Sequence, residues 1–590
     1  MIVPMRKLYI AARAADRDRL LKALRALGVV HLVPVDPARA VADEETLRQI
    51  GLLQRALQVL SPISPAGPPP GLSPAEAAQR VLEIQRRSAE GRNRLALLHR
   101  ELAQMEIWGD LEWKHLQELR GAGIEVGFYA VPRGAVGAIG AECVEIVAPL
   151  PGRQVLVAVA NRGGPAELPR AAVPLPLPLR DAPAIRAEAA EIDRALKEDA
   201  RRLPELARLV PEMRAELVRL QQRAEYARAL HSAAADEHLF ALQGWVPADK
   251  AAGLAERMAA GDIAAALHIR DPEPQEEPPT LVRPPAWARP IEGLFQILGT
   301  VPGYREFDVS VPFLVALPIF TAMLISDAAY GALMMLVPLA GYRSISQAVG
   351  PRFTQLLIVV GAVAMAWGCV VSSFFGVALY PPLVSVDLSE SSRAFLMSLS
   401  FTIGAVHLSL AQGWQAVRFF PGLRFLSKAG WALFIWGMYG VVRMLVLKIP
   451  LGWGTPWPYL LLCGASLAVV FAHPSRNIVK MLALGLASFP FSMLSAFSDI
   501  ISYVRLMAVG LVSGVLAASF NDMARNVEAW PLAAMILVFG HGLNLGLALI
   551  AMFAHGVRLN MLEFCNHLGM QWTGFPYQPF MRPAIQEITR

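Results

Sequence analysis

Apolar runs fill the second half of the chain and constrain its fold more than any other feature. Seven runs lie at about 311–340, 354–380, 395–417, 429–447, 457–472, 484–520 and 531–561. About 20 apolar residues are enough to cross a lipid bilayer as a helix. Residues 1–300, in contrast, are rich in arginine and glutamate. The sequence therefore predicts a large soluble half followed by an all-α membrane half.

The charges between the runs predict how the chain crosses the membrane. Positive residues favour the cytoplasmic side. The three basic loops carry Arg343 and Arg352, then Arg418, Arg424 and Lys428, then Arg476 and Lys480. The loop PPLVSVDLSESS between the first two is acidic. If the first run is two helices, all three basic loops are cytoplasmic, whereas a single helix would place them outside. We therefore predict about eight spans, with both termini in the cytoplasm.

Composition excludes several classes of protein. Hydrophobic residues make up 55% of the chain and charged residues 17%, which is too apolar for a soluble protein and too charged for a wholly membrane-embedded one. The net charge of +6 reflects basic loops rather than nucleic acid binding, because much of the excess lies between apolar runs. Four scattered cysteines without a CxxC pattern argue against a disulfide framework or a zinc site. Residues 1–20 lack the apolar run of a signal peptide, so we expect the soluble half in the cytoplasm.

The soluble half begins and ends with pieces of one small α/β lobe. KLYIA predicts a strand, the leucines of Arg17–Leu27 have helical spacing, Gly28 ends that helix, and VVHLV follows as a strand. FALQGWVPAD at 240–249, a helix at 250–260 and AALHIR would complete the lobe.

Two long polar helices are predicted between these pieces. The first begins at 43–60, is interrupted by SPISPAGPPPGLSP, starts again at a capping box, SPAE, and runs to about Arg120. The second covers 181–236, with Pro204 and Pro211 as kinks. Residues 123–180 between them are strand-like. An antiparallel coiled hairpin with a second α/β lobe at its far end fits this order, and two independent domains joined by helical linkers are the alternative.

These elements define five predicted parts. They are a proximal α/β lobe (1–42 and 237–270), a helical hairpin arm (43–120 and 181–236), a distal α/β lobe (121–180), a Pro-rich linker (271–300) and a transmembrane domain (301–590).

Charged residues inside the apolar runs are the candidates for function, because a charge within hydrocarbon costs about 2.5–3.5 kcal/mol on insertion scales. Arg505 lies too far inside its run to snorkel past the C-terminal end, and Asp499 is a candidate to neutralise it. In the last run, His541, Asn544, His555 and Arg558 fall on one polar stripe at about 100° per residue. The alternatives are a snorkelling arginine and satisfied core histidines.

The two arginines lie at nearly equal distances along the chain from Pro531, so a turn there would place them at similar depth. Facing a common gap, they would keep a partner carboxylate ionised and block a direct ion leak. For Asp327, in ISDAAYGA, a helix cap and a functional role both stay open. The sequence holds no Walker A, HExxH, GxSxG or EF-hand motif. We therefore expect no cofactor or metal, and any nucleotide chemistry belongs to a partner chain.

The chain resembles the large membrane subunit of archaeal-type and bacterial V/A-type rotary ATPases, subunit I, the counterpart of the eukaryotic subunit a. The resemblance runs nearly end to end. It is carried in order by RKLYIAA, FALQGWVP, PPAWARPIEGL, GTVPGYREFD, SDAAYG, AWGCVVSSFFG, FSDIISYVRLMAVGL and AHGVRLNMLEF.

The resemblance implies a non-catalytic stator subunit in the bacterial inner membrane, carrying protons or Na⁺ through two half-channels. Arg505 and Arg558 would face the carboxylate of the rotor ring. Glu563, His555, His541, Asn544, Asp499 and Asp327 are the half-channel candidates. The implied partners are the proteolipid (c/K/L-type) ring, E/G-type peripheral stalks, a d/C-type central-stalk connector and membrane lipid, with no nucleic acid.

Two other readings stay open. A secondary ion or solute transporter with a regulatory cytoplasmic domain predicts internal repeats in the membrane half. A membrane receptor predicts a sizeable external loop.

Overall fold

The computed structural model describes residues 1–38, 41–109, 112–162, 164, 166–260, 264–475 and 477–581. Arg476, one of the charges behind the predicted topology, lies outside the described residues. The chain divides into two compact units. The first joins Met1–Val33 to Ala235–Met581, and the second is built on Pro34–Ala234.

The soluble part of the first unit is an antiparallel sheet in the order β2-β8-β1-β9, with β7 paired to β8. Its strands pair the two ends of the soluble half directly, with Met5 opposite Pro247. Gly28 ends α1 in the left-handed conformation, at φ 59°, that glycine adopts without strain. The elements are β1 (Met5–Arg13), η1 (Ala14–Asp16), α1 (Arg17–Leu27), β2 (His31–Val33), β7 (Ala234–Ala235), β8 (Leu239–Pro247), α7 (Ala248–Ala251), α8 (Leu254–Ala260) and β9 (Ala265–Arg270).

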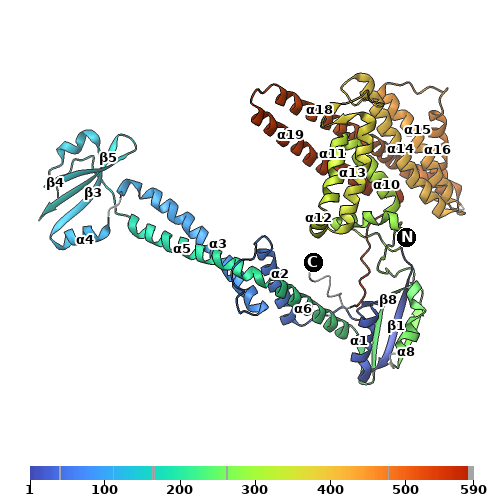
Figure 1. Ribbon diagram of the computed structural model, residues 1–590, viewed down its shortest axis with the longest axis horizontal. Helices are drawn as coiled ribbons and strands as arrows, with labels where there is room; N and C mark the ends of the chain where they lie inside the picture. The colour runs from blue at the N-terminus through green and yellow to red at the C-terminus, as the bar shows by residue number, and fades with distance from the viewer. Residues whose placement is uncertain are drawn as a thin grey trace. The chain divides into compact units, whose positions relative to one another are not determined.

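The second unit pairs long helices and carries a sheet in the order β4-β5-β3-β6 (Figure 1). α3 and α5 run antiparallel, because Arg87 contacts Asp199 at 2.9 Å and Arg94 contacts Glu188 at 2.7 Å. Hydrogen bonds from Arg94 and Arg180 lower the pKa of the Glu188 carboxyl to about 2. The elements are α2 (Glu44–Leu60), α3 (Pro74–Gln104), η2 (Glu106–Trp108), α4 (Trp113–Gly121), β3 (Ile124–Pro132), η3 (Arg133–Ala138), β4 (Cys143–Leu150), β5 (Gln154–Arg162), β6 (Val173–Pro174), α5 (Ala182–Leu206), η4 (Ala207–Leu209) and α6 (Val210–His231).

Helix boundaries in this unit differ in two places from the sequence prediction. The capping box at Ser73 forms, but α3 ends at Gln104 instead of continuing to Arg120. In the 3₁₀ turn that follows, Trp108 is buried and packs edge-on against Phe128. The second long helix is likewise two helices separated by a 3₁₀ turn. Pro211 opens α6 in its first turn rather than kinking a continuous helix, because its missing N–H is tolerated there.

The rest of the first unit is mainly helical. Among its described residues, five helices are long and apolar enough to cross a membrane, namely α13, α14, α15, α17–α18 together, and the continuous segment Trp530–Leu568. α10, α11 and α16 are shorter and apolar. The elements are η5 (Ala286–Ile291), α9 (Glu292–Leu298), α10 (Ser310–Ile325), α11 (Ala328–Ala340), α12 (Tyr342–Val349), α13 (Pro351–Val371), β10 (Ser373–Phe374), β11 (Val377–Ala378), α14 (Glu390–Phe419), α15 (Arg424–Leu447), α16 (Trp457–Val470), α17 (Ile478–Ser502), α18 (Val504–Arg525), α19 (Trp530–Ala551), the π-helical η6 (Met552–Val557) and η7 (Leu559–Phe564), and α20 (Cys565–Leu568).

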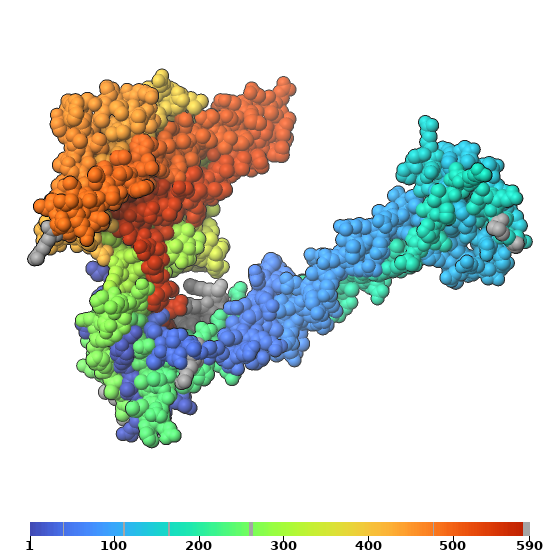
Figure 2. Space-filling model, turned by 180° about the vertical axis from the view of Figure 1, so that it is seen from behind, coloured from blue at the N-terminus to red at the C-terminus, as the bar shows by residue number. Residues whose placement is uncertain are grey.

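The first apolar run is two helices, as the loop charges predict, and they meet at Ser326–Asp327. The number of spans stays a prediction. α18 and α19 pack side by side and project from the other helices (Figures 1 and 2).

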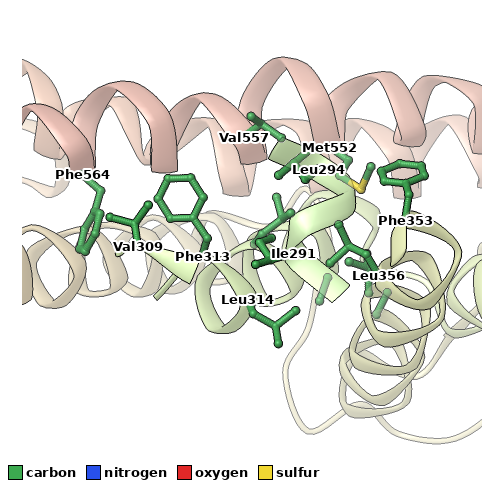
Figure 3. Packing of buried hydrophobic residues seen from close by; sticks show 14 of the residues in the cluster. Ile291, Leu294, Val309, Phe313, Leu314, Phe353, Leu356, Met552, Val557 and Phe564 are labelled. Atoms are coloured by element: carbon green, nitrogen blue, oxygen red, sulfur yellow. The ribbon is translucent and has the colours of Figure 1, made fainter. Parts of the chain in front are cut away.

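Glycines let α11 and α13 approach backbone to backbone. A Cβ at Gly361 would lie 2.5 Å from the backbone nitrogen of Met335, and one at Gly368 would lie 2.0 Å from that of Ala328. Small residues support such close packing between apolar helices. Beside this pair, side chains from α9, α10, α13 and the π-helical segment form one hydrophobic core, with Phe313 and Met552 among them (Figure 3).

The segment after α20 connects the helical part to the sheet. Tyr577 donates its N–H to Thr280 O at 3.1 Å and its hydroxyl to Val29 O at 2.5 Å. Gln578 N donates to His31 Nδ1 at 3.1 Å, and Phe580 N donates to Val30 O at 2.8 Å. The C-terminal end of the last helix is therefore clipped to the edge of the soluble sheet.

Replacing Gly361 with alanine should destabilise the helical part. The added Cβ has backbone rather than a flexible side chain in its way, and overpacking costs about 1–3 kcal/mol. The thermal midpoint of the detergent-solubilised chain should fall. Gly413→Ala on α14 is the matched control, because its Cβ meets nothing within 4 Å. Equal midpoints for the two variants would contradict this packing account.

Docking of the C-terminal clip should weaken in acid. Burial lowers the pKa of His31 from 6.5 and outweighs the opposing hydrogen bond to Gln578. Because the docked pKa is depressed, docking is complete above about pH 6.5 and weakens as pH falls through the docked value. Hydrogen exchange in residues 575–581, corrected for intrinsic rates, should rise in acid. His31→Gln should remove this pH dependence and His268→Gln on β9 should keep it; a wild-type profile for His31→Gln would refute the assignment.

Candidate functional site

A helix break sets the position of Arg505. α17 ends at Ser502, and Arg505 follows in the first turn of α18. Tyr503 at the break is fully buried, and its hydroxyl lies 2.7 Å from Nδ1 of His407. Arg505 Nε donates to Ser502 O at 2.9 Å. The buried tyrosine thus anchors the break from which the arginine extends.

The π-helical turn brings Arg558 to Glu563. Residues five apart lie about 140° apart around an α-helix, so these two side chains would diverge in one. A π-helix bonds residue i to i+5, which stacks them, and such turns occur often at functional sites. Here Arg558 Nε lies 3.7 Å from Oε1 of Glu563.

Both arginines share the Glu563 carboxylate. Arg505 Nη2 donates to Oε1 at 2.7 Å, so the two guanidinium groups meet at one oxygen. The Glu563 side chain is 4% exposed, whereas the Arg505 and Arg558 side chains are 23% and 53% exposed. Oε2 of Glu563 has no hydrogen-bond partner among the described residues. The cluster carries one positive charge in excess, and that charge lies on its exposed side.

Arg558 ends an exposed face of the last helix. Val538, Phe539, Ile550 and Phe553 are exposed along it at helical spacing. A continuous apolar face of this kind can contact lipid or an apolar helix of another chain. The arginine at its end can bind an anionic group on that helix.

Asp499 does not neutralise Arg505, in contrast to the sequence-based expectation. It accepts from His567 Nε2 at 3.1 Å, and Gln412 Nε2 lies 2.9 Å from His567 Nδ1. These three residues line a polar hollow of about 600 Å³, the Asp499 vestibule, together with Gln415. The helix break and the π turn bring Glu563, not Asp499, to the arginine, which sequence spacing cannot show.

Lys428 also lines this vestibule, although in the sequence it serves only as a topology charge. The side-chain oxygens of Gln412 and Gln415 are buried there without a hydrogen-bond partner in the described part of the chain. Buried acceptors of this kind are usually satisfied by water. The vestibule is therefore suited to hold water.

A second polar cluster, the His541 cluster, consists of Tyr330, Ser513, Asn521, His541 and Asn544. Tyr330 Oη lies 2.7 Å from His541 Nδ1, and His541 Nε2 lies 3.1 Å from Asn521 Oδ1. Asn544 Nδ2 donates to Tyr330 Oη at 3.1 Å and to Ser513 O at 2.9 Å. The cluster links α11, α18 and α19 through one chain of hydrogen bonds.

Asp327 caps α11 beside this cluster. Its carboxylate accepts from the backbone N–H groups of Ala329, Tyr330, Phe375 and Gly376 and from the Ser373 hydroxyl, at 2.7 to 3.1 Å. The side chain is buried. Five donors compensate the buried charge, so the structure assigns Asp327 the cap, and a part in ion transfer stays a prediction.

The predicted polar stripe of the last helix is divided in two. His541 and Asn544 belong to the His541 cluster, while Arg558 lies beside Glu563. The predicted stripe assumed that successive side chains are rotated by about 100°, as in an α-helix. This angle does not hold in the π turns, because each turn there contains more residues than in an α-helix. His555 Nδ1 is buried without a partner among the described residues.

Sequence analysis missed residues of both polar clusters and of the helix break before Arg505. His407 stacks on Phe564 with ring centroids 4.3 Å apart and contacts Tyr503, yet it lies in an apolar run that holds no charged residue. Its signal was the cost of a buried imidazole within an apolar run. The missed residues are Tyr330, His407, Gln412, Gln415, Tyr503, Ser513, Asn521 and His567. Within the described ranges, no group of three or more His, Cys, Asp or Glu could hold a metal ion.

Comparison with known proteins identifies one relative that spans nearly the whole chain and others that span about three fifths of it, although no family model matches. V-type ATP synthase subunit I 1 of Treponema pallidum (strain Nichols) is 29% identical over 637 residues, covering 98% of this chain and 100% of that protein. V-type ATP synthase subunit I of Borreliella burgdorferi is 31% identical over 63% of this chain and 65% of that protein. A-type ATP synthase subunit I of Methanocaldococcus jannaschii is 26% identical over 58% and 55%.

A solved structure of the cytoplasmic N-terminal domain of subunit I, homolog of subunit a, of V-ATPase is 19% identical and covers 45% of this chain and 100% of that one. Its TM-score of 0.19 is too low to support a conclusion about the fold.

The membrane-capable helices of the C-terminal part, together with the N-terminal α/β region, define a helical membrane protein with an α/β part. Its curated relatives make it a homologue of subunit I of the V-type and A-type ATP synthases, which confirms the family resemblance read from the sequence motifs.

Replacing Asp327 with alanine should destabilise the helical part strongly. Each buried donor left without an acceptor costs about 1–3 kcal/mol, and five donors depend on this carboxylate. The thermal midpoint of the solubilised chain should drop well below wild type. Asp522→Ala, which removes an exposed carboxylate paired with Arg525, should change stability by less than about 0.5 kcal/mol. A normal midpoint for Asp327→Ala would contradict the capping role.

Proposed function

We propose that this chain is the membrane stator subunit of a V/A-type rotary ATPase and carries ions past a rotating ring of proteolipid subunits. The single observation that carries the proposal is the meeting of Arg505 and Arg558 at one buried carboxylate, with both guanidinium groups partly exposed. Nucleotide chemistry would belong to partner chains.

The charge of this cluster explains why it suits a ring carboxylate. Glu563 offsets one of the two positive charges, so the cluster tolerates its apolar surroundings while no partner is near. A ring carboxylate that approaches the exposed Arg558 finds the remaining positive charge. That charge favours the ionised carboxylate, which forces release of the bound ion. Arginine stays protonated throughout, so the positive barrier persists.

Two polar clusters lie on either side of the arginines along the chain and support a path in two halves. Ser513 of the His541 cluster is eight residues beyond Arg505 on α18, roughly 12 Å at 1.5 Å per residue. The Asp499 vestibule lies on the other side of Arg505 in sequence. We assign the vestibule to the cytoplasmic half-channel and the His541 cluster to the outer one.

This assignment places both termini and the soluble parts in the cytoplasm, with about eight spans in a bacterial inner membrane. Lys428, one of the basic loop charges, lines the vestibule on its proposed cytoplasmic side, in agreement with the preference of positive residues for that side.

The second unit would anchor the peripheral stalks. Its α/β end holds a hollow of about 640 Å³ lined by Trp113, Tyr129, Leu177 and Leu179, among others. Leu177 and Leu179 are exposed, which a protein partner would cover. The d/C-type connector and lipid complete the partners we propose.

Replacing Arg505 with alanine should abolish coupled transport. Without the guanidinium, the Glu563 charge loses its nearest partner and a ring carboxylate is no longer kept ionised. In liposomes holding the whole complex, ATP-driven ion uptake should fall at least tenfold while all subunits still co-purify. Arg525→Ala is the matched control, because it removes an exposed arginine from the other end of α18. Normal uptake by Arg505→Ala would reject the proposed role.

A further inference from the structure

We propose that the His541 cluster selects the proton over Na⁺, with His541 as the group through which each proton passes. The inference rests on the proposed function, since it names the ion that the outer half-channel accepts. It is carried by the direction of the hydrogen bonds in the cluster.

The neighbours of His541 fix which ring nitrogen carries hydrogen. Asn521 Nδ2 donates to Phe375 O at 2.6 Å, so Asn521 Oδ1 points toward the imidazole and can only accept. His541 Nε2 therefore bears the hydrogen and Nδ1 is the acceptor. Tyr330 Oη donates to Nδ1 and itself accepts from Asn544 Nδ2. The orientation of the Asn521 amide and the tautomer of His541 thus follow from the hydrogen bonds of the whole cluster.

An imidazole held in this way can transfer a proton and keep its own net charge unchanged at the end of the transfer. Uptake of a proton at Nδ1 forms an N–H bond there and displaces the Tyr330 hydroxyl. Loss of the Nε2 proton to water breaks the other N–H bond. One proton enters, one leaves, and the ring ends neutral, after which exchange of the two tautomers restores the starting state. His541 is half-buried, so water can reach one side of it.

Na⁺ has no comparable route through the cluster. It is about the size of Ca²⁺, which binds oxygen ligands at roughly 2.3–2.6 Å, whereas Tyr330 Oη and His541 Nδ1 are already in contact at 2.7 Å. A cation between them would have to push the two atoms well apart. It would also exchange oxygen ligands for an imidazole nitrogen, which hard cations disfavour.

The oxygens near His541 are also committed to other donors. The Asp327 carboxylate, which contacts the backbone N–H of Tyr330, accepts five hydrogen bonds. Asn521 Oδ1 accepts from His541, and Asn544 Oδ1 accepts from Ser513 at 3.3 Å. In the vestibule, by contrast, the side-chain oxygens of Gln412 and Gln415 have no hydrogen-bond partner within the described ranges, so the vestibule does not discriminate between the two ions. One selective step is sufficient, because an ion must pass both halves.

The test uses the whole complex in liposomes, with ATP-driven uptake of protons and of labelled Na⁺ followed separately. His541→Ala should lower proton uptake about a hundredfold, within the usual range for losing a proton-transfer group. Added imidazole should restore uptake in proportion to its concentration. 1-Methylimidazole should not, because one of its nitrogens is blocked. His473→Ala, which removes an exposed histidine between α16 and α17, is the matched control and should pump without added imidazole.

Each outcome decides between specific alternatives. Rescue by both imidazoles would mean that the ring only fills space, which overturns the relay. Normal proton uptake by His541→Ala would overturn it as well. If the alanine variant does not assemble, His541→Gln, which keeps hydrogen-bonding groups, must assemble and fail to pump protons; normal pumping by it refutes the proposal. ATP-driven Na⁺ uptake that persists with a protonophore overturns the selectivity but leaves the stator function intact. Uptake of neither ion by wild type overturns the stator function itself.

Discussion

The cost of charge in apolar surroundings is the constraint on which the helical half of this protein depends. The chain places two arginines within apolar helices and compensates them with one buried glutamate. Glu563 offsets one of the two positive charges, which lowers the cost of the cluster in apolar surroundings when no partner is near. The other positive charge remains and attracts an anion. The same side chains thus account for stability without a partner and for the proposed response to a ring carboxylate.

Departures from regular helix produce that arrangement. The break at Tyr503 begins a new helix just before Arg505, and the π turns align Arg558 with Glu563. Tyr503 is held by His407, and His407 stacks on Phe564, the residue after Glu563. One aromatic cluster therefore supports both irregularities, so the two arginines are positioned by the same part of the core.

Asp327 stabilises a different irregularity by the same principle. A carboxylate that accepts five hydrogen bonds joins the α10–α11 break to the β10–β11 turn. Tyr330, three residues on, is thereby held toward His541. The Asp327 cap and the proposed relay are therefore neighbours in one hydrogen-bond network.

The sequence by itself determined the class of protein, because apolar length, loop charge and the cost of buried arginine are local quantities. It predicted the paired ends of the soluble sheet, the capping box at Ser73, the two-helix first run, and Arg505 and Arg558 as candidates. Only the tertiary structure decided which carboxylate meets the arginines. Asp499 is closer to Arg505 in sequence, yet Glu563 is the contact, because a helix break and a π turn change the angle between side chains in a way that regular spacing does not register. His407, Gln412 and His567 were missed for the same reason. Each lies in or next to an apolar run, and its hydrogen-bond partner comes from a different helix or from the break between two helices.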